Sequence, residues 1–148
     1  REELGEPVAD VRVFHTDHLK PFHVSGALVP RLIDEAPVLA VLATQCEGRS
    51  EFRDAAELRV KESDRIEAIA DCLRAMGGNI ETFADGFAVT GPTPLKGAIL
   101  DAEGDHRIAM AFAVAGLIAE GETVIENSEG ILTSFPNFQS ELERLCIV

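Results

Sequence analysis

Two alanine-rich apolar runs are the feature that most limits what this chain can fold into. Residues 40–43 read Ala-Val-Leu-Ala and residues 113–116 read Ala-Val-Ala-Gly, an offset of 73 positions. Each run follows an acidic residue, Asp34 or Asp105, and each ends in Glu-Gly before a short alternating segment. Self-similarity at a fixed period indicates structural units that bury their apolar faces against one another.

Hydrophobic periodicity and turn residues predict the elements of each unit. Asp85-Gly86 lies between two short apolar runs, which is typical of a hairpin, and Gly77-Gly78 ends a helix. Ser63 fits the N-cap of that helix. The predicted helices cover residues 34–46, 63–76, 106–119 and 136–145. The predicted strands cover residues 10–14, 22–25, 50–53, 79–83, 87–90, 98–101 and 123–127.

The helices predicted at 34–46 and 106–119 are apolar on nearly every side. A helix of that kind is buried, and its small residues allow another backbone to approach closely. The repeats therefore predict an α/β domain whose apolar helices pack together inside and whose sheets lie outside, unlike a doubly wound sheet.

Composition limits the partners. The 148 residues carry 13 Lys and Arg against 26 Asp and Glu, for a formal net charge of -13. Nucleic acid is not an expected partner, because binding it requires a basic surface. No apolar run approaches the roughly 18 residues that span a bilayer, so a membrane is not expected either. The chain begins at Arg1 without an apolar leader, and we expect a cytoplasmic piece of a longer protein.

The cysteines and histidines give no sign of a metal site or a disulfide. Cys46, Cys72 and Cys146 lie in apolar pattern and are predicted to be buried thiols, and the eight Phe are predicted to be core. The alternation of a strand would not place His15, His18 and His23 on the same face. Surface histidines are therefore favoured over a zinc site. No metal is expected.

Charged residues begin the predicted helices. Residues 61–65 (Lys-Glu-Ser-Asp-Arg) begin one, Asp34-Glu35 another and residues 105–107 (Asp-His-Arg) a third. Carboxylates there commonly cap the helix and complement its dipole, and that role is favoured for Asp34 or Asp105 taken alone. Arg65 and Arg107 are cations at helix N-termini, where the helix dipole disfavours positive charge. Their presence there favours a bound anion, which the planar guanidinium groups would hold.

Four ordered segments resemble the 5-enolpyruvylshikimate-3-phosphate synthase (3-phosphoshikimate 1-carboxyvinyltransferase) family. Residues 57–66 (ELRVKESDRI) and 105–110 (DHRIAM) are similar to its two C-terminal signatures. Residues 134–138 (SFPNF) resemble its closing motif, and residues 33–37 (IDEAP) resemble the segment with its catalytic aspartate.

The resemblance implies an enolpyruvyl transferase-like fold: an inside-out α/β barrel-type domain of repeated βαβαββ units. This chain would be a single partial C-terminal domain over 1–148. An incomplete unit would cover approximately 1–62, a second unit 63–135, and a closing helix 136–146. The N-terminal domain would be absent, and with it half of the ligands, so the chain alone is expected to be inactive. The full enzyme is expected to be a monomer.

The implied reaction moves the enolpyruvyl group of phosphoenolpyruvate to the 5-hydroxyl of shikimate 3-phosphate and releases phosphate. By resemblance, Asp34 accepts the hydroxyl proton and contacts shikimate 3-phosphate. Glu62 exchanges a proton with the methylene carbon, and Lys61 lies between the substrates and stabilises negative charge. Arg65 and Arg107 would bind phosphoenolpyruvate. No metal or organic cofactor is implied.

Two positions depart from the family pattern, and two other functions stay open. Thr133 stands where many members have a lysine, and Glu57 stands where many have an asparagine. One alternative is the related transferase that acts on UDP-N-acetylglucosamine, although residues 60–65 (VKESDR) favour shikimate 3-phosphate. The other alternative is a non-catalytic module that only binds an anion.

Overall fold

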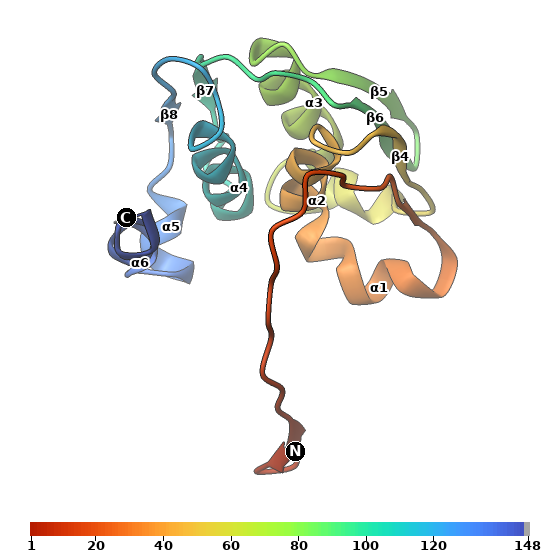
Figure 1. Ribbon diagram of the computed structural model, residues 1–148, viewed down its shortest axis with the longest axis vertical. Coiled ribbons are helices and arrows are strands. Elements are labelled where there is room, and N and C mark those ends of the chain that lie inside the picture. The colour runs from red at the N-terminus through yellow and green to blue at the C-terminus, as the bar shows by residue number, and fades with distance from the viewer. Residues whose placement is uncertain (147–148) are drawn as a thin grey trace.

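Three separate β-sheets and six α-helices form in the computed structural model, which describes residues 1–146 (Figure 1). The strands are β1 (Glu2–Glu3), β2 (Glu6–Pro7), β3 (His23–Val24), β4 (Gly48–Phe52), β5 (Asn79–Phe83), β6 (Gly86–Gly91), β7 (Ile99–Asp101) and β8 (Val124–Glu126). The α-helices are α1 (Val29–Leu32), α2 (Ala36–Ala43), α3 (Arg65–Ala75), α4 (His106–Gly116), α5 (Gly130–Ser134) and α6 (Phe138–Cys146). Short 3-10 helices are η1 (Gly26–Leu28), η2 (Ile33–Glu35) and η3 (Ala56–Val60).

The largest sheet is mixed. Its strand order is β3-β4-β6-β5, in which β3 runs parallel to β4 and both other pairs are antiparallel. A second sheet pairs β7 with β8 in parallel, and β1 with β2 form a small antiparallel hairpin. The α/β class is therefore confirmed, with one mixed sheet, one parallel pair and one antiparallel pair.

The predicted repeat is visible in both parallel pairs. In each, a strand that precedes an apolar helix pairs in parallel with the strand that follows it: β3 with β4 around α2, and β7 with β8 around α4. Parallel bridges extend the two pairs at equivalent places, Leu19 with Cys46 and Lys96 with Glu120.

Helices α2, α3 and α4 contact one another and form the centre of the core. In α3, Ile66, Ile69 and Leu73 recur at helical spacing, and all three are fully buried. From the sheet, Phe52 stacks on Phe87 at 5.6 Å between ring centroids. These helices bring their N-terminal ends together, which positions the charged residues described below.

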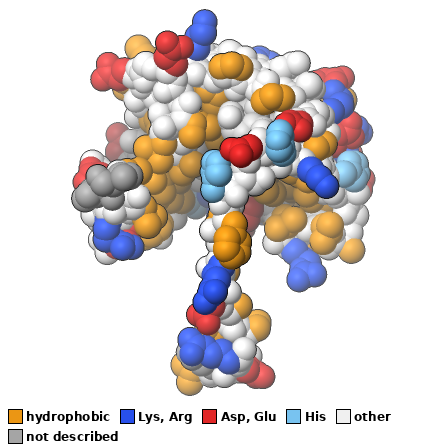
Figure 2. Space-filling view, viewed as in Figure 1, with side chains coloured by type: hydrophobic (Ala, Val, Ile, Leu, Met, Phe, Trp, Pro, Cys, Tyr) orange, Lys and Arg blue, Asp and Glu red, His pale blue; other side chains and the backbone are white. Residues whose placement is uncertain are grey.

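Several sequence expectations need correction. Residues 10–14 form no strand, because no other strand lies beside them to complete a ladder. They belong instead to an extended segment that projects from the body (Figures 1 and 2). The side chains of Val11, Val13 and Phe14 are exposed. Asp64 caps α3 in place of Ser63: its carboxylate accepts the backbone N–H of Glu67.

Three groups of side chains that the sequence predicts to be buried are exposed in the structure. Helix α2 is not buried on every side, since Val38 and Leu42 are 37% and 42% exposed. Cys146 is exposed in the last turn of α6, whereas Cys46 and Cys72 are buried as predicted. Phe135 joins Phe14 among the exposed aromatic side chains. The common reason is that none of these side chains belongs to the hydrophobic core of residues 1–146 or packs against it. No described helix is long and apolar enough to cross a membrane.

Candidate functional site

Three helix beginnings meet at one cluster of charges. η2 leads into α2 and supplies Asp34, the segment before α3 supplies Lys61 and Glu62, and the first residue of α3 is Arg65. Helix α4 supplies Arg107 in its first turn, next to its N-cap Asp105. The five predicted site residues therefore lie together, although they come from separate elements.

Arg65 is the centre of the cluster, and its side chain is 1% exposed. Its Nε donates to Asp105 Oδ2 at 2.8 Å, and its Nη1 donates to Asp34 Oδ1 at 3.0 Å. Its Nη2 donates to Glu62 Oε2 at 2.6 Å. Burial disfavours the charge of the guanidinium, but the hydrogen bond and charge of Asp105, with the other carboxylates, raise its pKa above the usual value.

Asp105 is a fully buried carboxylate with two structural roles. Its Oδ1 accepts the backbone N–H groups of Arg107 at 2.9 Å and Ile108 at 3.4 Å, which caps α4. Its Oδ2 accepts from Arg65 and from the Ser63 hydroxyl. Burial would raise the pKa of this carboxyl, yet the Arg65 hydrogen bond and the cap hydrogen bonds hold the pKa below its usual value.

Asp34 and Glu62 are the most exposed of the predicted site residues, and Lys61 lies beside them. The carboxylates of Asp34 and Glu62 are 48% and 51% exposed, in contrast to Asp105. Lys61 Nζ lies 2.8 Å from Glu57 Oε1 and 3.9 Å from Asp34 Oδ1. The hydrogen bond to Glu57, and then the nearby carboxylate charges, raise the pKa of the Lys61 ammonium.

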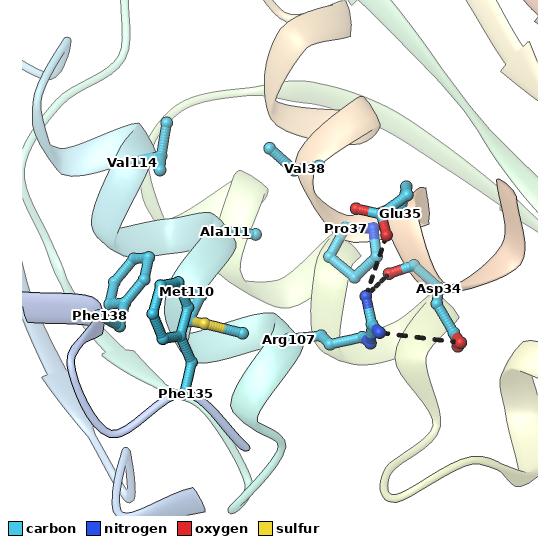
Figure 3. Close-up of a pocket in the computed structure, with 10 residues that line it drawn as sticks. All are labelled: Asp34, Glu35, Pro37, Val38, Arg107, Met110, Ala111, Val114, Phe135 and Phe138. Carbon is cyan, nitrogen blue, oxygen red and sulfur yellow. Dashed lines mark hydrogen bonds and ion pairs between the residues drawn. The ribbon is translucent and has the colours of Figure 1, made fainter. Parts of the chain in front are cut away.

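Arg107 connects the cluster to a cleft. Its Nη1 donates to the backbone carbonyl of Asp34 at 2.9 Å and to Glu35 Oε1 at 3.2 Å. Its Nη2 lies 3.8 Å from Asp34 Oδ2. These residues form the polar end of a cleft of about 230 Å³ between α2 and α4, and apolar side chains form the rest (Figure 3). The apolar lining consists of Pro37, Val38, Met110, Ala111, Val114, Phe135 and Phe138.

The cluster combines half-exposed carboxylates with cations, an arrangement suited to proton transfer beside an anionic substrate. Carboxylates nevertheless outnumber cations. Asp34, Glu35, Glu57, Glu62 and Asp105 face Lys61, Arg65 and Arg107, so the formal charge is -2. An anionic substrate would require further cations here.

The structure also shows what the sequence did not predict. Arg59 lies beside the cluster with four hydrogen bonds, and Asp105 pairs directly with Arg65. The Asp105 contact had a signal, since both residues begin apolar helices. Thr133 lies exposed in α5 and does not line the cleft. His15 and His18 are exposed beside Asp17 and Glu47, as surface histidines were expected to be.

Comparisons with known proteins agree with the geometry. The model of the family described as EPSP synthase (3-phosphoshikimate 1-carboxyvinyltransferase) matches residues 4–142. A 3-phosphoshikimate 1-carboxyvinyltransferase of Synechococcus sp. (strain RCC307) is 52% identical over 145 residues, covering 98% of this chain and 33% of that protein. One of Alkaliphilus oremlandii (strain OhILAs) is 53% identical over 141 residues, covering 95% of this chain and 33% of that protein.

A solved structure of EPSP synthase from Acinetobacter baumannii superposes with a TM-score of 0.82 at 40% identity, covering 86% of this chain and 30% of that chain. The chain spans about a third of the length of the curated relatives that it matches. With the family model matched over most of its length and the signature residues gathered in one cluster, the chain belongs to the EPSP synthase (3-phosphoshikimate 1-carboxyvinyltransferase) family.

Proposed function

We propose that this chain is part of an enzyme that transfers the enolpyruvyl group of phosphoenolpyruvate to the 5-hydroxyl of shikimate 3-phosphate and releases phosphate. Family membership supports the reaction. The observation that carries the proposal is the convergence of Asp34, Lys61 and Glu62 with two arginines at the junction of three helices.

The reaction requires a proton to leave the hydroxyl and another to reach the methylene carbon of phosphoenolpyruvate. In this proposal Asp34 accepts the first proton as the hydroxyl oxygen attacks the adjacent carbon. Glu62 donates the second proton, which gives a tetrahedral intermediate, and takes a proton back from the new methyl group as phosphate leaves. Both carboxylates are half-exposed, so substrates can reach them.

The cations stabilise the negative charge that moves in these steps. Lys61 would lie between the substrates and balance charge on the departing phosphate. Arg107 is partly exposed and offers a fork to phosphoenolpyruvate. Arg65 would join it when the substrate takes the place of Asp34 or Glu62 on its Nη atoms, while buried Asp105 keeps its hold on Nε.

The excess of carboxylates supports a second part of the proposal. Phosphoenolpyruvate is strongly anionic, and a cluster with a formal charge of -2 does not attract it without more cations. We place those cations in an N-terminal domain that closes over the cluster. The 148 residues then form a partial C-terminal domain, as the sequence predicts.

Phosphate release tests the proposed function. The longer protein that contains this chain should release phosphate only when both phosphoenolpyruvate and shikimate 3-phosphate are present. Glu62→Gln should lower kcat at least about 100-fold, as expected for a lost general acid. The matched control, Glu143→Gln on the exposed face of α6, should keep full activity.

Three outcomes would contradict this assignment. Transfer to UDP-N-acetylglucosamine in place of shikimate 3-phosphate would assign the related transferase. Binding of phosphoenolpyruvate without any phosphate release would indicate an anion-binding module. Turnover by the isolated 148-residue chain would refute the second domain's contribution.

A further inference from the structure

Arg59 makes four hydrogen bonds that the proposed chemistry does not use. Its Nη1 donates to Asp64 Oδ2 at 2.8 Å and to Glu67 Oε1 at 3.1 Å. Its Nη2 and Nε donate to the backbone carbonyls of Phe83 at 2.6 Å and Ala84 at 2.9 Å. One side chain thus joins the first turn of α3 to the end of β5 and the turn that follows it.

The segment that Arg59 spans contains two of the proposed site residues. Lys61, Glu62 and Ser63 lie between Arg59 and its partner Asp64, and among the described residues none of the three forms a backbone–backbone hydrogen bond. Their position depends on side chains and on the two ends of the segment. Because Arg59 lies at one end and bonds Asp64 at the other, it fixes the distance between those ends.

The hairpin turn that accepts from Arg59 is itself firmly attached. The backbone carbonyl of Asp85 accepts from Ala55 N at 2.8 Å, and its carboxylate accepts from Asp54 N at 3.0 Å. Arg53 lies 3.1 Å from the same carboxylate. The turn is therefore held by the three residues just before η3, and it provides a rigid anchor for Arg59 within η3.

We infer that Arg59 is a positioning residue that sets the placement of Lys61 and Glu62 by clamping their segment to the β5–β6 turn. The inference rests on the proposed function for its kinetic consequence. Arg59 touches none of the reacting groups proposed above, so its loss should alter the rate of chemistry more than the binding of phosphoenolpyruvate. The planar fork suits this role better than an ammonium group, because a point charge cannot bond two carbonyls and two carboxylates at once.

Steady-state kinetics of the longer protein test the inference. Arg59→Met keeps the length of the side chain and removes every donor, and it should lower kcat about 10- to 100-fold, the scale expected for a site misplaced by about 1 Å. The KM for phosphoenolpyruvate should change less than about threefold, because Arg107 keeps its contacts. Arg59→Lys should recover part of kcat.

The matched control is Arg49→Met. Arg49 also bridges two carboxylates, Glu51 and Glu81, each at 2.8 Å, but it lies on β4 away from the segment. It should leave kcat within about twofold of the unchanged protein, since exposed ion pairs contribute little. Equal kcat values for Arg59→Met and Arg49→Met would overturn the inference, and so would a KM that rises as much as kcat falls.

A second variant and an activity-independent measurement keep the test decisive if Arg59→Met folds poorly. Asp64→Asn keeps an oxygen to cap α3 and loses the charge that Arg59 bonds, so it should lower kcat in the same direction. Two amides report the far end of the clamp, because Glu67 N donates to the Asp64 carboxylate and Ala68 N donates to the Asp64 carbonyl. Both should exchange with solvent faster in both variants than in Arg49→Met, while the rest of α3 stays unchanged. Unchanged exchange there would refute the clamp. No activity in the unsubstituted protein would instead refute the proposed function, and exchange would still decide the role of Arg59.

Discussion

The two repeats begin alike and end differently. Each places an apolar helix between two parallel strands, yet β4 continues into α3 and the β5–β6 hairpin, whereas β8 continues into α5 and α6. Among residues 1–146, the first repeat therefore has a four-stranded sheet and the second has two strands. Burial differs accordingly: consecutive residues Phe87, Ala88 and Val89 of β6 are all buried, whereas in the second sheet Leu100 is buried but Ile99 and Val124 are 69% and 42% exposed.

This difference shows that the repeated strand–helix–strand unit sets the arrangement of the central elements. The elements that follow each unit determine how much of its sheet is buried. The site residues also come from both repeats. Arg65 belongs to the closed repeat and is buried, whereas Arg107 belongs to the open repeat and remains partly exposed at the cleft. Asp105 links the two repeats because it caps α4 and bonds Arg65 of α3.

Breaking that link should have the largest effect. Asp105→Asn keeps an oxygen for the α4 cap but removes the charge opposite buried Arg65, and it should lower the free energy of unfolding by about 3–5 kcal/mol. Urea denaturation measures this change. Asp71→Asn, which removes an exposed partner of Arg74, should change it by less than about 1 kcal/mol. A similar loss in both variants would show that burial does not distinguish the pairs.

The effect of Asp105 should depend on pH. Its pKa is lowered in the folded protein, so its stabilisation is fully present above the unfolded value of about 3.9 and is lost as pH falls through the lower folded value. The stability difference between the unsubstituted protein and Asp105→Asn should therefore shrink in that acidic range. A difference that stays constant there would contradict an ionised Asp105.

A pair of equal truncations sharpens the contrast in packing. Leu73→Ala removes a fully buried side chain of α3 and should cost about 2–5 kcal/mol of unfolding free energy. Leu132→Ala removes a side chain of α5 that is 67% exposed, and it should cost less than about 0.5 kcal/mol. Thermal or urea unfolding compares the two. Equal costs would mean that the open repeat is covered in solution.

Substrate affinity probes the open side of the site. In the longer protein, Arg107→Ala should raise the KM for phosphoenolpyruvate about tenfold or more, the factor that corresponds to a loss of about 1.4 kcal/mol. Arg74→Ala, an exposed arginine of α3, should leave that KM unchanged. An unchanged KM in Arg107→Ala would remove Arg107 from the site.

Thiol labelling should separate the repeats without altering stability. Burial raises the pKa of the Cys72 thiol in α3 to about 12, whereas Cys146 at the end of α6 is exposed. Cys146 should react with a thiol reagent at neutral pH while Cys72 stays unmodified until the protein unfolds. Labelling of both at equal rates would show that α3 opens as readily as α6.

The sequence predicted most of the framework because its signals are local. The alanine-rich runs predicted α2 and α4, strand β5 was predicted with its observed bounds, and Asp85-Gly86 predicted the β5–β6 turn. Where partners decide the outcome, prediction was weaker. Residues 10–14 alternate like a strand, but strand formation requires a neighbour, which they lack here.

For the site, the motif resemblance identified the residues, and hydrophobic periodicity placed them at the N-terminal ends of helices. Neither could predict which side chains bond one another. The three carboxylates on Arg65 and the four hydrogen bonds of Arg59 depend on how helices and a hairpin turn pack in three dimensions.

The bonds of the site join distant parts of the chain, and this bears on how the protein folds. Arg65 and Asp105 are 40 residues apart, and Arg107 and the Asp34 carbonyl are 73 apart. Contacts of such long range require large loops to close first, so they form slowly. We expect the charged cluster to assemble late, after α2, α3 and α4 have docked. A refolding chain would therefore acquire its helices well before it acquires its site.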